Sequence, residues 1–130
     1  LIKEYPDVLI IHLKRFSQNF LRGGLKKISG HVSFPVQLDL SEYAKPLDTG
    51  FEKHLYNLTG VVVHGGNLGG GHYTAYVREG CDTDFRGGWY YCSDTHVARA
   101  KETQVLQSEA YLLFYERKER RFDPVEAATR

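Results

Sequence analysis

Short stretches of alternating apolar and polar residues recur along the chain and predict mainly β-strands. The run VLIIHL at 8–13 is apolar and β-branched, and it follows a Tyr-Pro-Asp turn, so it predicts a buried strand. Residues 28–34 alternate until Pro35, and residues 36–40 continue the pattern. This second region therefore predicts a pair of strands with a bend at the proline.

The second half of the chain predicts a long hairpin followed by further strands. Residues 55–64 and 72–77 have strand patterns, and the connection between them, GGNLGGG, gives the backbone unusual freedom. Further strands are predicted at 87–93 and 110–115, with a short helix at 101–107 between them. Many strands and little helix indicate an α+β fold dominated by antiparallel sheet.

Two segments lack a periodic pattern. Residues 41–53 carry Pro, Asp and Gly without a clear period, so they predict a long loop with one helical turn. After residue 117 the sequence is polar and shows no core-facing period. We therefore expect one domain at 1–117 and a polar tail at 118–130.

Composition and charge restrict the classes of function. The 130 residues are 42% hydrophobic, which is typical of one globular domain, and 17 basic against 16 acidic residues give a net charge of +1. This balance provides no overall field for a polyanion, and no apolar run is long enough to cross a membrane. Two cysteines form at most one disulfide, which favours a reducing intracellular compartment, the cytoplasm or nucleus. We expect neither nucleic acid nor membrane as a partner.

His72 stands between a glycine run and an alternating aromatic strand, and three roles are open to it: packing, metal binding and proton transfer. Metal binding is disfavoured because the sequence has no HExxH and no CxxC pattern. A phosphate-binding loop is disfavoured because the glycines precede a strand and no Gly-Lys-Ser/Thr follows them. A rigidly held base beside a flexible loop suits proton transfer.

Five segments together resemble the C-terminal half of the catalytic domain of a ubiquitin-specific protease. They are YPDVLIIHLKRF at 5–16, VVHGG at 62–66, GHYTAY at 71–76, WYYCSD at 89–94 and AYLLFY at 110–115. The resemblance covers residues 1–117. It implies a papain-like cysteine peptidase fold, with this chain forming mainly the antiparallel β palm, and it implies hydrolysis of the bond after the C-terminal glycine of ubiquitin.

The resemblance also implies roles for individual residues. His72 matches the catalytic histidine, and Ser93 and Asp94 match the positions that orient its ring. Nothing in the chain resembles the box that holds the nucleophilic cysteine, so we expect Cys81 and Cys92 to be structural and the isolated chain to be inactive. The N-terminal half of the catalytic domain is then needed for activity. A structural zinc belongs to the family's finger region before residue 1, and we expect no metal or cofactor in this chain.

The resemblance places substrate-binding residues along a channel for the ubiquitin tail. These are His64, Gly70, Gly71 and Tyr73, covered by loops at 41–53 and 65–71. For His64, a strand-end histidine capped by backbone is an equal alternative. Expected partners are ubiquitin and ubiquitinated proteins. In the motif at 5–16, we interpret His12, Lys14, Arg15 and Phe16 as residues for packing and surface charge, not for catalysis.

Other interpretations remain open from the sequence. Without a nucleophile the chain could be a catalytically inactive ubiquitin-binding or scaffold fragment. Two RGG triplets, at 22–24 and 86–88, are also found in RNA-binding segments, although the balanced charge favours turns there. The LRGG at 21–24 repeats the end of ubiquitin, and we interpret it as a turn between strands, with mimicry of the substrate tail as the alternative.

Overall fold

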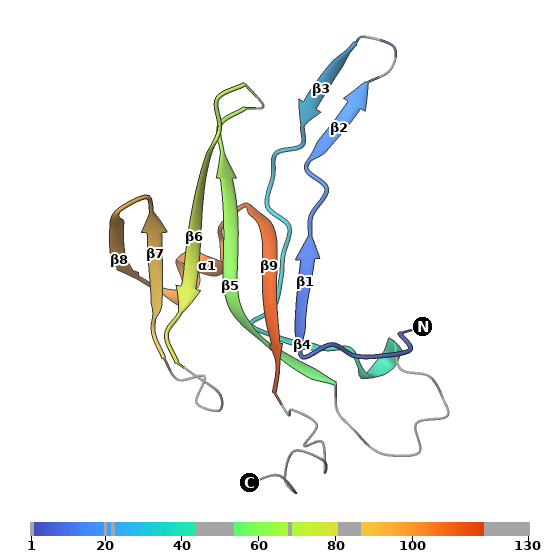
Figure 1. Ribbon diagram of the computed structural model, residues 1–130, viewed down its shortest axis with the longest axis vertical. Helices are drawn as coiled ribbons and strands as arrows, with labels where there is room; N and C mark the ends of the chain where they lie inside the picture. The colour runs from blue at the N-terminus through green and yellow to red at the C-terminus, as the bar shows by residue number, and fades with distance from the viewer. Residues whose placement is uncertain are drawn as a thin grey trace, which may run out of the picture.

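A seven-stranded antiparallel sheet forms the body of the molecule (Figure 1). The computed structural model describes residues 2–19, 21, 23–43, 54–67, 69–80 and 87–118. Along the sheet the order is β1-β9-β5-β6-β7-β8, and β4 pairs with β5. The strands are β1 (Val8–His12), β4 (Gln37–Asp39), β5 (Leu55–Gly65), β6 (His72–Arg78), β7 (Trp89–Ser93), β8 (His96–Ala100) and β9 (Ala110–Arg117). This architecture confirms the predicted class.

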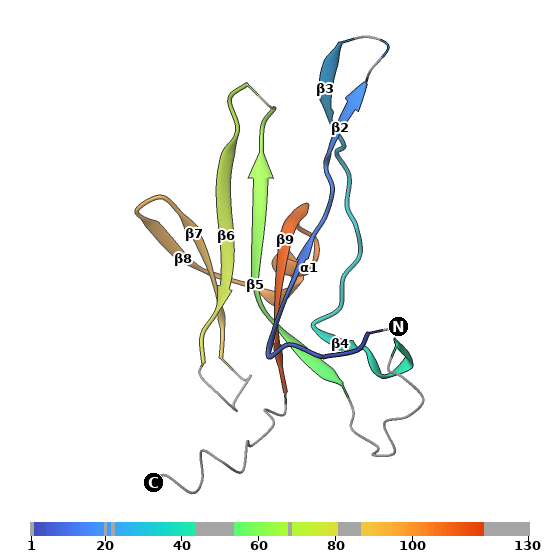
Figure 2. The same cartoon turned by 45° about the vertical axis from the view of Figure 1, so that its right-hand side comes forward.

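A second, two-stranded sheet projects beyond the end of the main one (Figures 1 and 2). It consists of β2 (Phe16–Asn19) and β3 (Gly24–Lys27), which the hydrophobic pattern did not predict. The turn expected at 21–24 lies between them, as far as the structure describes that segment. Two helical turns agree with the sequence prediction, η1 (Ser41–Tyr43) and α1 (Glu102–Leu106).

The prediction of a strand at 28–34 is wrong. This segment has no strand partner in the described structure, and only Phe34 of it enters the core. The buried guanidinium of Arg15 donates to the carbonyl oxygens of Ile28, at 3.2 Å, and Gly30, at 2.7 Å. A side chain therefore satisfies backbone acceptors that a neighbouring strand would otherwise satisfy.

The expectation that the first strand is buried is also wrong, because β1 lies at an edge of the sheet. Val8 and Ile10 are 52% and 55% exposed, whereas the alternate residues Leu9 and Ile11 pack against the core. The register pairs Ile11 with Leu113 and, in turn, Leu113 with Val61. One face of the sheet is therefore covered while the other faces solvent.

The core lies on the covered face of the sheet. Its most completely buried side chains come from β5, β9 and the helix α1; they are Tyr56, Leu58, Val61, Val105 and Tyr115. Burying each apolar side chain of this size stabilises the fold by about 1.5–3 kcal/mol. Both tyrosines also satisfy their hydroxyls, donating to Pro6 O at 2.6 Å and Pro35 O at 2.7 Å. Within the described ranges no helix is both long and apolar enough to cross a membrane.

Candidate active site

Two hairpins bring His72 and Ser93 to the same end and the same face of the sheet. His72 begins β6, opposite Gly65 of β5. On its other side β6 pairs with β7, where Ala75 lies opposite Cys92. Continuing this register by one residue puts Ser93 opposite Thr74. Since side chains alternate along a strand, His72, two residues before Thr74, shares the face of Ser93.

The ring of His72 has polar partners on one nitrogen. Its Nε2 lies 2.9 Å from Ser93 Oγ and 3.9 Å from the carboxylate oxygen Oδ2 of Asp94. Within the described part of the chain, no hydrogen bond reaches Nδ1. If Nε2 carries the proton and donates to Ser93, Nδ1 has its lone pair available as a base. The arrangement thus orients the ring and leaves Nδ1 able to accept a proton.

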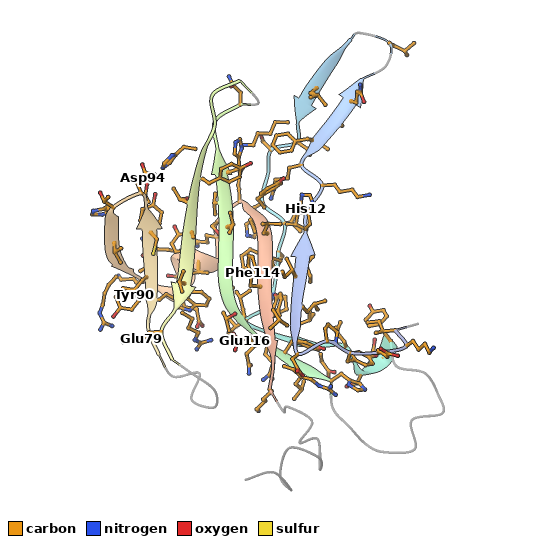
Figure 3. All side chains as sticks on the ribbon, in the orientation of Figure 1. His12, Glu79, Tyr90, Asp94, Phe114 and Glu116 are labelled. Atoms are coloured by element: carbon orange, nitrogen blue, oxygen red, sulfur yellow. The ribbon has the colours of Figure 1, made fainter. Side chains whose placement is uncertain are left out.

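Asp94 begins the two-residue connection between β7 and β8, where Ser93 pairs with His96. Its φ of +49° is the one positive value at a non-glycine residue among those described. Asp tolerates this conformation better than most residues, and such strain concentrates at functional sites. Figure 3 places Asp94 at the opposite end of its hairpin from Tyr90. Because its side chain is 82% exposed, its ion pair with a protonated His72 is weakened by solvent.

An aromatic cluster surrounds His64 at the same end of the sheet. His64 is buried, and its ring centroid lies 4.8 Å from that of Tyr73, the residue paired with it on β6. The ring of Phe16 follows at 5.6 Å and that of Tyr111 at 6.4 Å. A Cβ added at Gly71 would overlap His64 Nε2, so a larger residue fits there only if the His64 ring or the backbone moves.

The structure divides the predicted site residues into two groups. His72, Ser93 and Asp94 come together, whereas Tyr73 of β6 and its ladder partner His64 of β5 lie on the opposite face of the sheet by strand alternation. Gly71 contacts the second group. Gly70 shows no comparable steric need, because a Cβ there would meet Asn67 Oδ1 only at 4.0 Å. The segments at 44–53 and residue 68, parts of the two predicted covering loops, lie outside the described residues.

The two interpretations of His64 can be compared with its surroundings. Its Nδ1 is buried and, among the described residues, has no hydrogen-bond partner. A backbone cap on that nitrogen is therefore missing from the described structure. A buried, unsatisfied nitrogen in a cluster of rings is a feature that a bound ligand can satisfy.

Sequence reasoning missed two members of the cluster, Phe16 and Tyr111. Phe16 begins β2 and its ring lies 5.8 Å from that of Tyr111, which in turn makes an edge contact with His12 at 4.9 Å. The three residues come from β1, β2 and β9, so their meeting depends on long-range pairing. The sequence pattern around them carries no local signal for it.

The cysteines do not supply a nucleophile near His72 in the described structure. Cys92 is a free, half-buried thiol, and it precedes Ser93 on β7, so its side chain faces the other side of the sheet. Cys81 lies outside the described residues. Among the residues that are described, no three His, Cys, Asp or Glu side chains are grouped to hold a metal ion.

Comparison with known proteins identifies the family. Residues 1–115 match the family model of ubiquitin carboxyl-terminal hydrolase, and the chain belongs to this family. It is 45% identical over 125 residues to ubiquitin carboxyl-terminal hydrolase 1 of Arabidopsis thaliana and 42% identical over 138 residues to ubiquitin carboxyl-terminal hydrolase 45 of Danio rerio. These matches cover 90% and 89% of this chain but only 11% and 17% of the relatives.

A solved structure extends the likeness to three dimensions. The SAGA DUB module Ubp8/Sgf11/Sus1/Sgf73 bound to monoubiquitin contains a chain that matches 88% of this one with a TM-score of 0.74 and 32% identity. The match covers 24% of that chain. The likeness confirms the expected papain-like peptidase fold, with this chain forming its β-rich part.

Proposed function

We propose that the chain is the part of a deubiquitinating cysteine peptidase that supplies the general base and the binding site for the ubiquitin tail. The observation that carries the proposal is the 2.9 Å contact between His72 Nε2 and Ser93 Oγ, which leaves Nδ1 facing away from these partners. The nucleophilic cysteine comes from another part of the protein. Family membership supports the reaction class.

The proposed chemistry begins with a proton transfer. His72 Nδ1 takes the thiol proton, and the thiolate attacks the carbonyl carbon of the last glycine of ubiquitin. The imidazolium then gives its proton to the leaving lysine amine as the amide C–N bond breaks. In the second half, Nδ1 takes a proton from water, the hydroxide displaces the thiolate from the acyl group, and the thiolate recovers the proton.

Ser93 and Asp94 divide the work of orienting and stabilising His72. The serine hydroxyl oxygen accepts a hydrogen bond from Nε2–H and fixes the ring, but it carries no charge. The carboxylate of Asp94, at 3.9 Å, supplies charge to the imidazolium when it forms. Together the two residues orient the base well. They stabilise its protonated form only moderately, because the Asp94 carboxylate is exposed to solvent.

The tail of ubiquitin is proposed to run along the aromatic cluster on one face of the sheet and to pass Gly71, at the end of β5 and β6, to reach His72 on the other face. Gly71 keeps the channel narrow, and His64, Gly70 and Tyr73 line it with Phe16 and Tyr111. The unsatisfied Nδ1 of His64 supports a direct contact with the tail. The related module that binds monoubiquitin supports ubiquitin as the partner, with ubiquitinated proteins as substrates.

The alternative of an inactive ubiquitin-binding fragment is favoured by one observation, the orientation of Cys92 away from the face of His72. A fluorogenic ubiquitin amide separates the two functions. The full-length protein is expected to hydrolyse it, and the isolated 130-residue chain is expected to be inactive. Binding of ubiquitin without hydrolysis by the full-length protein would favour the alternative. Turnover by the isolated chain that is lost in Cys92→Ala would make Cys92 the nucleophile.

The division of work between Ser93 and Asp94 is tested in the full-length protein. Ser93→Ala is expected to lower kcat by about tenfold because the ring can rotate, and Asp94→Asn to lower it less, because only charge is lost. Ser93→Asn, which restores an amide at this position, should retain activity. If Ser93→Ala leaves kcat/KM unchanged while Asp94→Asn abolishes it, Asp94 alone is the third catalytic residue, beside the cysteine and His72.

A further inference from the structure

Lys27 joins the projecting hairpin to the end of β5. It is the last residue of β3, where it pairs with Phe16. Its ammonium nitrogen donates to the carbonyl oxygen of His64 at 2.7 Å and to that of Gly66 at 2.9 Å. One charged group thus holds two backbone acceptors, and hydrogen bonds to a charged donor are stronger than neutral ones.

These carbonyls lie where β5 extends past its neighbour. Pairing with β9 ends at Val63, opposite Ala110, whereas pairing with β6 continues to Gly65. Beyond Val63, β5 has β6 on one side and the β2–β3 hairpin on the other (Figure 1). Lys27 occupies the place of the missing strand and satisfies acceptors that β9 no longer reaches.

The two carbonyls flank the residue that faces His72. One ammonium reaches both carbonyl oxygens, which belong to residues two apart at the point where β5 ends. Between them, Gly65 is the ladder partner of His72. Gly66 has a φ of +87°, so the chain turns into the loop immediately after the two carbonyls that Lys27 binds. Holding these residues fixes the strand against which His72 is aligned.

We propose that Lys27 is a positioning residue for His72, acting through the backbone of His64–Gly66. The inference rests on the proposed peptidase function and extends it to a residue from the hairpin. Lys27 touches neither the reacting atoms nor the ring of His72. Its removal loosens the end of β5, so the imidazole samples orientations that are unproductive for proton transfer.

The test uses the full-length protein with three variants. Lys27→Met keeps the aliphatic chain and removes the donor, Lys27→Arg keeps a charged donor, and Lys26→Met is the matched control. Lys26 is the exposed neighbour on β3 and makes no side-chain hydrogen bond in the described structure. Hydrolysis of a fluorogenic ubiquitin amide gives kcat and KM, and titration with an electrophilic ubiquitin probe gives the active fraction.

Lys27→Met is expected to lower kcat about 10- to 10²-fold, with KM within about twofold, because a small misalignment of a reacting group is costly. Lys27→Arg should recover most of the loss, and Lys26→Met should match wild type. Hydrogen exchange at 64–67 and 69–73 should be about tenfold faster in Lys27→Met alone. A kcat equal to that of Lys26→Met, once corrected for active fraction, would overturn the proposal.

The exchange measurement separates this proposal from the proposed function. If the wild-type protein does not hydrolyse ubiquitin amides, the proposed function fails, and with it the positioning role of Lys27 in catalysis. If hydrolysis occurs but hydrogen exchange at the end of β5 is the same in Lys27→Met and Lys26→Met, Lys27 does not hold this backbone. The positioning proposal is then wrong, and the proposed function stands.

Discussion

Two histidines lie at opposite ends of the central hairpin strands, in contrasting surroundings. His54, just before β5, is 2% exposed; its ring stacks on Tyr5 with centroids 3.6 Å apart, and its Nδ1 lies 3.1 Å from a guanidinium nitrogen of Arg117. His72, at the start of β6, has a side chain 53% exposed and faces Ser93 and Asp94. A histidine thus contacts a cation at one end of the strands, and a histidine at the other end contacts a hydroxyl and a carboxylate.

The difference supports the proposal that His72, and not His54, transfers the proton. Arginine is always charged and only donates, so Nδ1 of His54 must be an acceptor, and a proton there would bring two cations together in a buried site. At His72, by contrast, Nε2 lies 3.9 Å from the carboxylate of Asp94 and the side chain is half exposed. The buried end of the sheet therefore stabilises the fold, and the exposed end is suited to chemistry.

The largest effect on stability is expected at the buried end. Leu58 is fully buried next to Tyr115. Leu58→Ala should lower the free energy of unfolding by about 2–5 kcal/mol, because it removes apolar contacts and leaves a cavity. Chemical denaturation measures this. Val97→Ala on β8, where Val97 is exposed, is the control and should change it by less than about 0.5 kcal/mol.

At the exposed end a small substitution should affect activity more than stability. In Gly71→Ala the new methyl group overlaps the ring of His64, so His64 or the loop must move. We expect kcat/KM to fall about 10²-fold in the full-length protein, with little change in unfolding. Gly69→Ala, whose methyl group would meet only Asn67 Oδ1 at 3.7 Å, should be near wild type. Equal losses in both would contradict a specific fit at Gly71.

A substitution of His54 should show the reverse pattern. His54→Phe keeps a ring against Tyr5 but removes the acceptor of the hydrogen bond from Arg117. The free energy of unfolding is expected to fall by about 1–3 kcal/mol. Thermal unfolding measures the loss. An unchanged melting temperature would mean that the Arg117 contact contributes nothing to the buried end.

The smallest effect is confined to alkaline pH. Burial raises the pKa of Tyr115 from 10.0 to about 12. Above pH 10 the unfolded state loses its proton first, so the contribution of the neutral phenol to stability is complete below pH 10 and is lost as the pH rises toward 12. Tyr115→Phe should flatten this part of the stability profile, measured by denaturation between pH 9 and pH 12.

The elements that the sequence predicted well are those with local signals. The glycine run before His72 indicated a long hairpin, and β5 and β6 form it. The short helix has a polar-apolar pattern of its own, and α1 confirms it. Ser93 and Asp94 were placed beside His72 by family resemblance alone, and the strand register supplies the physical reason.

Features that depend on distant pairing were not predictable in the same way. The alternation at 28–34 is that of a strand, but Arg15 satisfies that backbone instead. The contacts of Phe16 and Lys27 with the β5–β6 hairpin depend on the β2–β3 sheet, which brings both residues to the end of β5. No local period encodes such contacts, because they arise where a projecting hairpin meets the end of a longer strand.

The central claim, that His72 rather than any other histidine transfers the proton, is tested most directly by comparing kcat for His72→Ala and His54→Phe. Both variants are made in the full-length protein, and rates on a fluorogenic ubiquitin amide are corrected for folded fraction. His72→Ala is expected to lower kcat by about 10²–10⁴-fold while the melting temperature is retained, and His54→Phe to leave the corrected kcat unchanged. A His72→Ala variant that keeps its kcat, or an equal loss in both variants, would contradict the account.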